Sequence, residues 1–188
     1  MGNFMGTEEA MPSQAQLTQD PAGQAIDALS REELMLPGAR ELLATARLAR
    51  LAYCGPDGLP RVIPIGFHWT GEQVIVCTVP SSPKVRALSA RPRVALTIDT
   101  DEGTASRALS VRGVAAIDVV DGVPAEYLAA AVKGMDGEQA AQFEAQVRAL
   151  YKRMARITIE PLWARYFDFG GGRLPGFLRE LIAGGAAS

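Results

Sequence analysis

The sequence RVIPIGFHW at residues 61–69, followed after a short turn by QVIVCTV at residues 73–79, is the strongest indication of the fold of this chain. Both runs are rich in β-branched residues, which favour strands. A third apolar run, at residues 47–53, precedes the turn signal GPDG at residues 55–58, so two consecutive hairpins are predicted. Pro64 cannot donate to a strand ladder, so it predicts an edge strand or a strand whose open side faces a ligand.

The rest of the chain adds strands and short helices around these hairpins. Strands are predicted at residues 93–99, 108–119 and 155–169, the last as one strand or a pair, and helices at residues 39–50, 83–91, 124–133, 137–154 and 175–183. Ser30 and Glu33 have the spacing of a helix capping box, and Gly113 is a candidate bulge. The strands do not alternate regularly with crossover helices. This order predicts a mainly β protein with added helices, built as a small antiparallel barrel of about six strands.

Length and composition are those of one globular domain with an appended arm. Of 188 residues, 48% are hydrophobic and 21% are charged. Residues 1–28 show no sustained apolar period and are predicted to form a flexible N-terminal arm. Residues 29–188 are predicted to form a single domain, with a helical insertion at about 122–154.

The charge balance and the apolar runs indicate which partners to expect. Nineteen Lys and Arg against 21 Asp and Glu give a formal charge of −2, which provides no general attraction for nucleic acid or anionic membranes. No run reaches the roughly 18 apolar residues of a membrane span. The first residues lack the basic-then-apolar pattern of a signal peptide. We therefore expect a cytoplasmic protein that binds neither nucleic acid nor membrane.

Catalysis by side chains has little support in the sequence. Cys54 and Cys77 are too few for a four-ligand zinc site and are interpreted as small core residues. His68 is the only histidine, and its simplest interpretation is a strand residue near the surface. The nucleophile motif G-x-S-x-G is absent. The sequence therefore predicts no metal site and identifies no catalytic residue.

The sequence SSPKVR at residues 81–86 is the best candidate for a ligand site. It combines two hydroxyls, the N-terminus of a predicted helix and two cations, Lys84 and Arg86, which together suit a phosphate. The competing interpretation is a capped surface helix with solvated side chains. Arg61 is a candidate for a further cation from across the barrel. Near Pro64, main-chain groups left unpaired would contact the polar rim of a flat ligand, and three apolar residues would line its ring: Val62, Ile63 and Ile65.

These runs, in this order, resemble the pyridoxamine 5'-phosphate oxidase-like family of flavin-binding split barrels. The resemblance is carried by residues 61–69, VIVCT at 74–78, SPKVRAL at 82–88 and RPRVALTI at 91–98. It implies a six-stranded antiparallel Greek-key split barrel that forms a homodimer with FMN between the subunits. It also implies these cofactor-binding residues: Arg61, Val62, Ile63, Pro64 and Ile65 along the isoalloxazine ring, Cys77, Thr78, Ser82 and Lys84 at the ribityl chain and phosphate, and Arg86 as an additional phosphate partner.

The resemblance further implies an FMN-binding oxidoreductase that transfers hydride or electrons to or from a small molecule. Gly66 stands where the vitamin-producing oxidases carry a basic residue, and residues 162–166 only faintly echo their substrate-phosphate segment. Pyridoxine phosphate is therefore not expected as the substrate. The alternatives are a reductase that uses the 8-hydroxy-5-deazaflavin coenzyme, a non-enzymatic flavin- or haem-binding split barrel with His68 as the candidate haem ligand, and an interaction domain that has lost its ligand.

Overall fold

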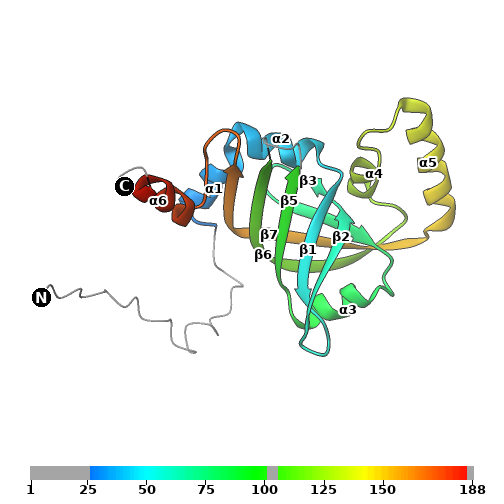
Figure 1. Ribbon diagram of the computed structural model, residues 1–188. Helices are drawn as coiled ribbons and strands as arrows, with labels where there is room; N and C mark the ends of the chain where they lie inside the picture. Colours follow the sequence, from blue (N-terminus) through cyan, green and yellow to red (C-terminus); the bar gives the residue numbers. More distant parts are fainter. Residues whose placement is uncertain (1–25, 101–105, 186–188) are drawn as a thin grey trace, which may run out of the picture.

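The computed structural model describes residues 26–100 and 106–185, so most of the predicted N-terminal arm lies outside the described residues. Within them, seven strands form one antiparallel sheet in the order β2–β1–β5–β6–β7–β4–β3 (Figure 1). The strands are β1 Leu48–Cys54, β2 Pro60–Gly66, β3 His68–Trp69, β4 Val74–Thr78, β5 Arg93–Thr100, β6 Arg107–Asp121 and β7 Arg153–Asp168. The helices are α1 Ala28–Met35, α2 Pro37–Thr45, α3 Pro83–Ala90, α4 Ala125–Ala131, α5 Gly137–Leu150 and α6 Gly176–Gly185. None of these helices is long and apolar enough to span a membrane.

The predicted mainly β fold with added helices is confirmed, but the sheet has seven strands instead of six. The single strand expected at residues 61–69 becomes β2 and β3, because the chain changes partners at Phe67. Gly66 pairs with Leu48, the first residue of β1, so the residues beyond it have no β1 neighbour left and pair with β4 instead. The two outer strands of the sheet are thus joined through one residue. This connection forces the sheet to curl on itself, although no ladder closes it between β2 and β4 among the described strands.

The concave side of the curled sheet holds the main core. Strand residues alternate between this core and the outer face, as in the exposure pattern of β5, where every second residue is buried. The core includes fully buried Leu51, Phe67, Leu96, Leu109 and Ile157. Leu42 and Leu43 add to it from α2, which covers one end of the barrel, while α3 lies at the other end (Figure 1).

Two helix predictions were too long at their C-terminal ends. The helix expected at residues 39–50 ends at Thr45, because Leu48 already pairs with Gly66 in the sheet. The helix expected at residues 137–154 ends at Leu150, because Met154 pairs with β6. Tertiary pairing overrode the local helical pattern in both places.

The predicted bulge at Gly113 is confirmed, and the extra residue lies on the partner strand. Arg112 pairs with Trp163 and Gly113 pairs with Pro161, which leaves Leu162 of β7 without an opposing residue. A Cβ at Gly113 would lie 2.3 Å from the main-chain oxygen of Glu160. Only glycine therefore allows the two backbones to approach each other in this way.

The extra residue reverses the inward and outward alternation of β7. Ile157 and Ile159 face the core before the bulge, whereas Ala164 and Tyr166 are the buried residues after it. Trp163 and its alternate neighbours are consequently turned to the outer face of the sheet. The bulge thus determines which side chains the second half of β7 presents to a ligand.

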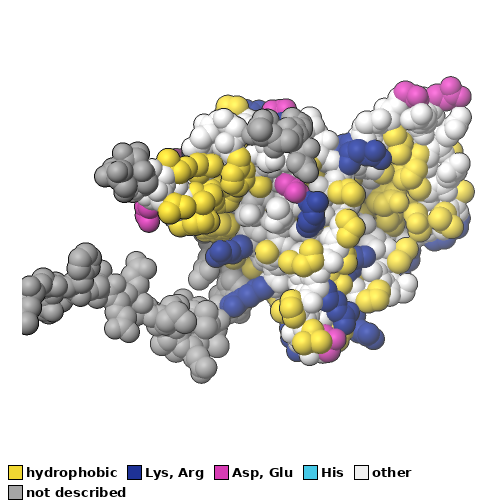
Figure 2. All heavy atoms as spheres, in the orientation of Figure 1, with side chains coloured by type: hydrophobic (Ala, Val, Ile, Leu, Met, Phe, Trp, Pro, Cys, Tyr) yellow, Lys and Arg dark blue, Asp and Glu magenta, His cyan; other side chains and the backbone are white. Residues whose placement is uncertain are grey.

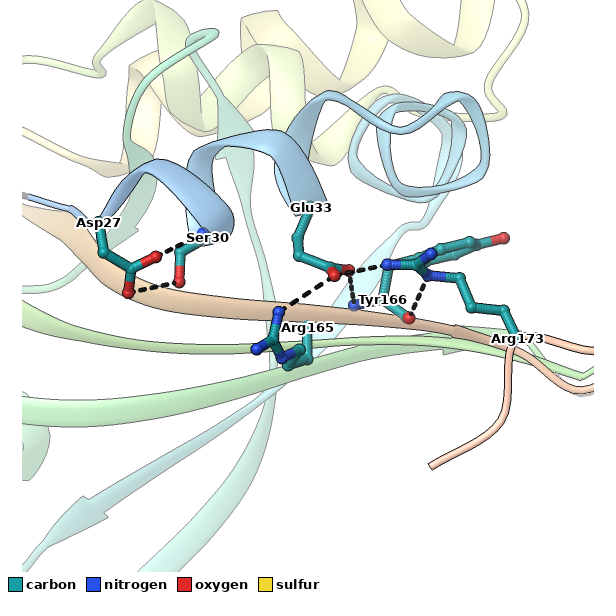
Figure 3. Close-up of polar contacts among 6 residues, drawn as sticks. All are labelled: Asp27, Ser30, Glu33, Arg165, Tyr166 and Arg173. Carbon is teal, nitrogen blue, oxygen red and sulfur yellow. Dashed lines mark hydrogen bonds and ion pairs between the residues drawn. The ribbon is translucent and has the colours of Figure 1, made fainter. Parts of the chain in front are cut away.

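Helix α1 is capped differently from the prediction. Asp27 is the N-cap residue and its carboxylate accepts a hydrogen bond from the Ser30 main-chain N–H at 2.6 Å, so the predicted capping box of Ser30 and Glu33 is wrong. Glu33 instead reaches across to β7, where it accepts from the main-chain N–H of Tyr166 at 2.9 Å (Figure 3). This part of β7 has passed the end of β4, so α1 covers an edge that has no strand neighbour.

The insertion between β6 and β7 is attached to the barrel by an ion pair of Glu126 with Arg156 of β7, at 2.8 Å, and by Lys133. A small core of Val123, Val147 of α5 and Met154 of β7 lies beneath its helices α4 and α5. Beyond α4, Lys133 Nζ donates to the carbonyl oxygens of Leu43 and Ala46 at 3.3 and 3.0 Å. The ammonium also lies 4.0 Å from the centre of the Phe67 ring, and burial lowers its pKa. These contacts place the insertion beside the gap between β2 and β4, where no ladder of the described strands closes the sheet.

Candidate functional site

Three of the predicted phosphate-binding residues lie together between β4 and α3. Thr78 is the last residue of β4, Ser82 precedes α3, and Lys84 is in its first turn. Lys84 Nζ donates to Thr78 Oγ1 at 3.2 Å and to Ser82 Oγ at 2.9 Å. We call these three residues the lysine–hydroxyl cluster.

No carboxylate in the described part of the chain neutralises the charge of this cluster. Among the described residues, Lys84 takes part in no ion pair, and burial lowers its pKa. Two of its three N–H donors bind the hydroxyl oxygens, so the third remains for a ligand. Because each hydroxyl accepts from Lys84, its own hydrogen is also available to donate. The cluster therefore offers three converging donors and a positive charge to an anion.

The start of α3 strengthens this preference for an anion. Ser82 is the N-cap residue, but its hydroxyl makes no capping bond to the helix and serves Lys84 instead. The first turn contains no acidic residue that would offset the positive end of the helix dipole. A phosphate placed here would meet both the helix terminus and the lysine.

The predicted edge position of the strand with Pro64 is confirmed, since β2 is an outer strand of the sheet. Its predicted ligand-contacting residues are divided between two faces. Val62 and Pro64 are exposed on the outer face, whereas Ile63 and Ile65 pack against the core. A flat ligand on the outer face could touch the side chains of the first pair and only the main chain of the second, because successive residues of a strand point to opposite sides.

The two predicted arginines do not join the lysine–hydroxyl cluster. Arg61 forms an ion pair with Asp57 at 2.9 Å, within the turn that leads into β2. Arg86 is exposed and follows Lys84 by two residues. Residues two apart on a helix do not face each other, so the helix directs these two cations to different sides. Among the described residues, the group around Lys84 therefore includes neither arginine.

Cys77 faces away from the cluster. It packs against the small core of the insertion, with Tyr127 and Phe143 among its neighbours. Burial, with a further contribution from Glu126 that Arg156 partly offsets, raises the pKa of its thiol to about 11. The thiol is therefore protonated at neutral pH and is not an activated nucleophile. Cys54, which was expected in the core, is exposed at the end of β1, where the chain enters the turn to β2.

No metal centre is present in the part of the chain that the structure describes. No group of three His, Cys, Asp or Glu side chains there could hold an ion. His68 lies in β3, paired with Ile75, and is partly buried. Side chains of the described residues thus supply binding groups more readily than catalytic ones.

A second polar cluster, which the sequence analysis did not identify, surrounds Glu33 (Figure 3). Its Oε1 accepts from Arg165 at 3.2 Å and from Arg173. Burial by itself would raise the pKa of Glu33, but the Tyr166 amide and the two guanidiniums outweigh it and hold that pKa below its ordinary value. Glu33 and Arg173 are 140 residues apart in sequence, so no local pattern could reveal their pairing.

The family model described as pyridoxamine 5'-phosphate oxidase matches residues 35–166. No curated protein matches the chain significantly.

Among solved structures, the conserved hypothetical protein Rv2991 from Mycobacterium tuberculosis is 20% identical, with a TM-score of 0.56 over 84% of this chain and 94% of that chain. An F420 reductase is 24% identical, with a TM-score of 0.47 over 66% and 94% of the two chains. The heme storage protein HutZ from Vibrio cholerae is 20% identical, with a TM-score of 0.49 over 71% and 93%. The first of these likenesses shows a shared fold.

Proposed function

Since the chain belongs to the pyridoxamine 5'-phosphate oxidase family, we propose that it binds FMN and acts as a flavin-dependent oxidoreductase on a small molecule. The observation that carries this proposal is the lysine–hydroxyl cluster. Lys84 is a partly buried cation whose side-chain partners, within residues 26–100 and 106–185, are two hydroxyls and no carboxylate. Such a group is poorly solvated unless an anion completes its environment, and the dianionic phosphate of FMN would do so.

The neighbouring outer face of β2 suits the ring of the cofactor. Val62 and Pro64 present an apolar surface there, and Val62 is 64% exposed. In this arrangement the chain binds and orients the cofactor, with Lys84 at the phosphate and β2 along the ring. FMN, when bound, supplies hydride and electron transfer, which fits a chain whose Cys77 thiol is inert.

We further propose that a second copy of the chain packs on the outer face of the sheet and completes the cofactor site. Small residues line the middle of this face: Ala52 of β1, Ala95 and Thr97 of β5, and Ser110 of β6. In Figure 2, charged side chains on this face are separated by uncharged surface. A surface of this kind can meet its own copy across a two-fold axis.

Titration of the purified protein with FMN tests the cofactor proposal. We expect one FMN per chain, and at least about a tenfold loss of affinity in Lys84→Met, because a charge-assisted contact to phosphate contributes about 1.5–3 kcal/mol. Flavin fluorescence measures both the number of FMN bound per chain and the affinity. Lys152→Met, which removes an exposed lysine from another part of the chain, is the matched control and should bind like the wild type.

Two results would contradict the FMN assignment. The first is equal FMN affinity in Lys84→Met and the wild type. The second is no FMN binding below about 100 μM, which corresponds to roughly 5.5 kcal/mol. Binding of the 8-hydroxy-5-deazaflavin coenzyme in its place would identify the alternative cofactor.

The oligomeric state tests the proposed second copy. Ala95→Arg places a charge in the middle of the outer face, where an unpaired cation would be buried on association. We expect light scattering to give the mass of a dimer for the wild type and the 20.0 kDa of one chain for the variant. Ala141→Arg, at an exposed position of α5, should leave the dimer intact. A wild-type protein with the mass of one chain would contradict the proposal.

A further inference from the structure

A cavity of about 710 Å³ lies beside the C-terminal half of β7, away from the lysine–hydroxyl cluster. Its walls come from β7, from the loop that follows it, from the first turn of α6 and from Glu33 of α1. A volume of this size falls within the range of roughly 300–1,000 Å³ found for small-molecule sites. Figure 1 shows α6 and α3 at well-separated ends of the molecule, so this cavity is distinct from the proposed FMN phosphate site.

The charged lining of the cavity is predominantly positive. Arg165, Arg173 and Arg179 line it, and among the described residues Glu33 is the one carboxylate that does so. Arg165 and Arg173 both bind the same oxygen of Glu33, so one negative charge is shared between two guanidiniums (Figure 3). Asp168 lies nearby but accepts from the Gly171 main-chain N–H at 2.6 Å, and it is not part of the lining.

The guanidiniums keep donors available for a ligand. Arg165 uses Nη1 for Glu33. Arg173 uses Nη2 for Glu33 and Nε for the carbonyl oxygen of Tyr166 at 3.0 Å, which fixes the plane of its fork. Their side chains are 40% and 45% exposed, so the remaining N–H groups are accessible. Arginines held in this way are prepared to bind a carboxylate or phosphate with two parallel hydrogen bonds.

The other walls are apolar. Trp163, Phe167, Leu174 and Pro175 contribute them. The guanidinium of Arg112 lies 4.2 Å from the centre of the Trp163 ring, a cation–π contact that orients that ring. An inorganic ion would make no contact with these apolar walls, whereas the apolar part of an organic anion would cover them.

We propose that this cavity binds a small organic anion, with its carboxylate or phosphate on Arg173 and Arg179 and its apolar part against Trp163 and Phe167. Arg173 and Arg179 both lie beyond the residues matched by the family model, which end at 166. The C-terminal segment of this chain thus contributes a ligand site of its own. The proposal does not depend on FMN binding.

Isothermal titration calorimetry of the full chain without flavin tests this site, with phenyl phosphate, benzoate and inorganic phosphate as probes at fixed ionic strength. We expect phenyl phosphate or benzoate to bind more tightly than inorganic phosphate. Arg179→Gln should weaken the better probe about tenfold, since each charge-assisted hydrogen bond lost has roughly that effect. Arg173→Gln should do the same. The side chain of Arg179 has no hydrogen bond or ion pair within the described residues, so its variant should fold normally.

Two controls separate this cavity from other anion sites. Arg40→Gln removes an exposed arginine of α2 that does not line the cavity and should leave the affinity unchanged. Lys84→Met should also leave it unchanged; a loss there instead would place the probe in the lysine–hydroxyl cluster and overturn the proposal. The proposal would also be overturned if Arg179→Gln and Arg173→Gln both bound the better probe as tightly as the wild type. It would be overturned as well if no probe bound when added at a 10-fold molar excess to about 1 mM protein.

Discussion

The Gly113→Val variant is expected to lose about 3 kcal/mol or more of its free energy of unfolding. A Cβ at this position would lie 2.3 Å from the main-chain oxygen of Glu160 and 3.0 Å from the Ile159 side chain. The nearest atom belongs to the backbone of the paired strand, so it cannot move aside without breaking the β6–β7 ladder. Chemical denaturation, monitored by circular dichroism, measures the loss in free energy of unfolding. A variant that fails to fold would correspond to the largest such loss.

Gly137→Val is the matched control for this substitution. Gly137 begins α5, and a Cβ there would meet nothing within 4 Å. Valine at the start of an exposed helix should change the free energy of unfolding by only about 0.5 kcal/mol. If both variants were equally stable, the close approach of the two strands at Gly113 would be refuted.

The bulge also links this glycine to function. Leu162, the extra residue, reverses the alternation of β7 and turns Trp163 and Arg165 outward to the proposed anion cavity. A Gly113 variant that folded by losing the bulge would move these side chains to the opposite face, because a shift of one residue exchanges the two faces of a strand. Its affinity for phenyl phosphate would then fall together with its stability.

Local patterns were sufficient to predict most of the strands. The turn signals at residues 55–58 and 70–72 and the alternating runs around them correctly placed β1, β2 and β4. The errors occurred where distant partners decide the structure. The division of β2 from β3 depends on where β1 begins, and the ends of α2 and α5 depend on strand pairing. These boundaries depend on pairing between distant segments, which the pattern within one segment does not contain.

The same distinction applies to the sites. The lysine–hydroxyl cluster was predictable because Ser82 and Lys84 are neighbours in sequence and Thr78 is only six residues from the lysine. The cavity around Glu33 and Arg173 was not predictable, because α1 and the segment after β7 meet only in the folded chain. The spacing of Ser30 and Glu33 even suggested a different role, that of a helix cap. In the fold, the buried carboxylate of Glu33 binds distant partners and does not cap the helix as the local motif suggested.

Glu33→Ala is the second variant with a large expected effect, a loss of about 2–3 kcal/mol in the free energy of unfolding. The side chain is 9% exposed, and its removal leaves the Tyr166 main-chain N–H buried without an acceptor. Arg165 and Arg173 lose their shared partner, but they are partly solvated, which keeps the loss below that of a fully buried pair. Glu32→Ala, at an exposed neighbouring position of α1, is the control and should change little.

Glu33→Gln separates the charge from the hydrogen bond, and its effect should depend on pH. The amide oxygen can still accept from Tyr166, so the expected loss is the electrostatic part alone. The pKa of Glu33 is lowered in the folded protein relative to its ordinary value of 4.5, so the unfolded chain binds its proton at a higher pH than the folded chain does. The stability that comes from the charge is therefore fully present above about pH 5 and is lost as the pH falls through the folded pKa.

Denaturation of the wild type and Glu33→Gln between pH 7 and pH 3 measures this dependence. We expect the difference between their free energies of unfolding to be constant near neutral pH and to shrink steadily on acidification, because the wild-type carboxyl becomes neutral like the amide. A difference that grew on acidification would mean that the folded pKa is raised, and that burial outweighs the two guanidiniums. In that event burial, and not the pairing with Arg165 and Arg173, would dominate the pKa of Glu33.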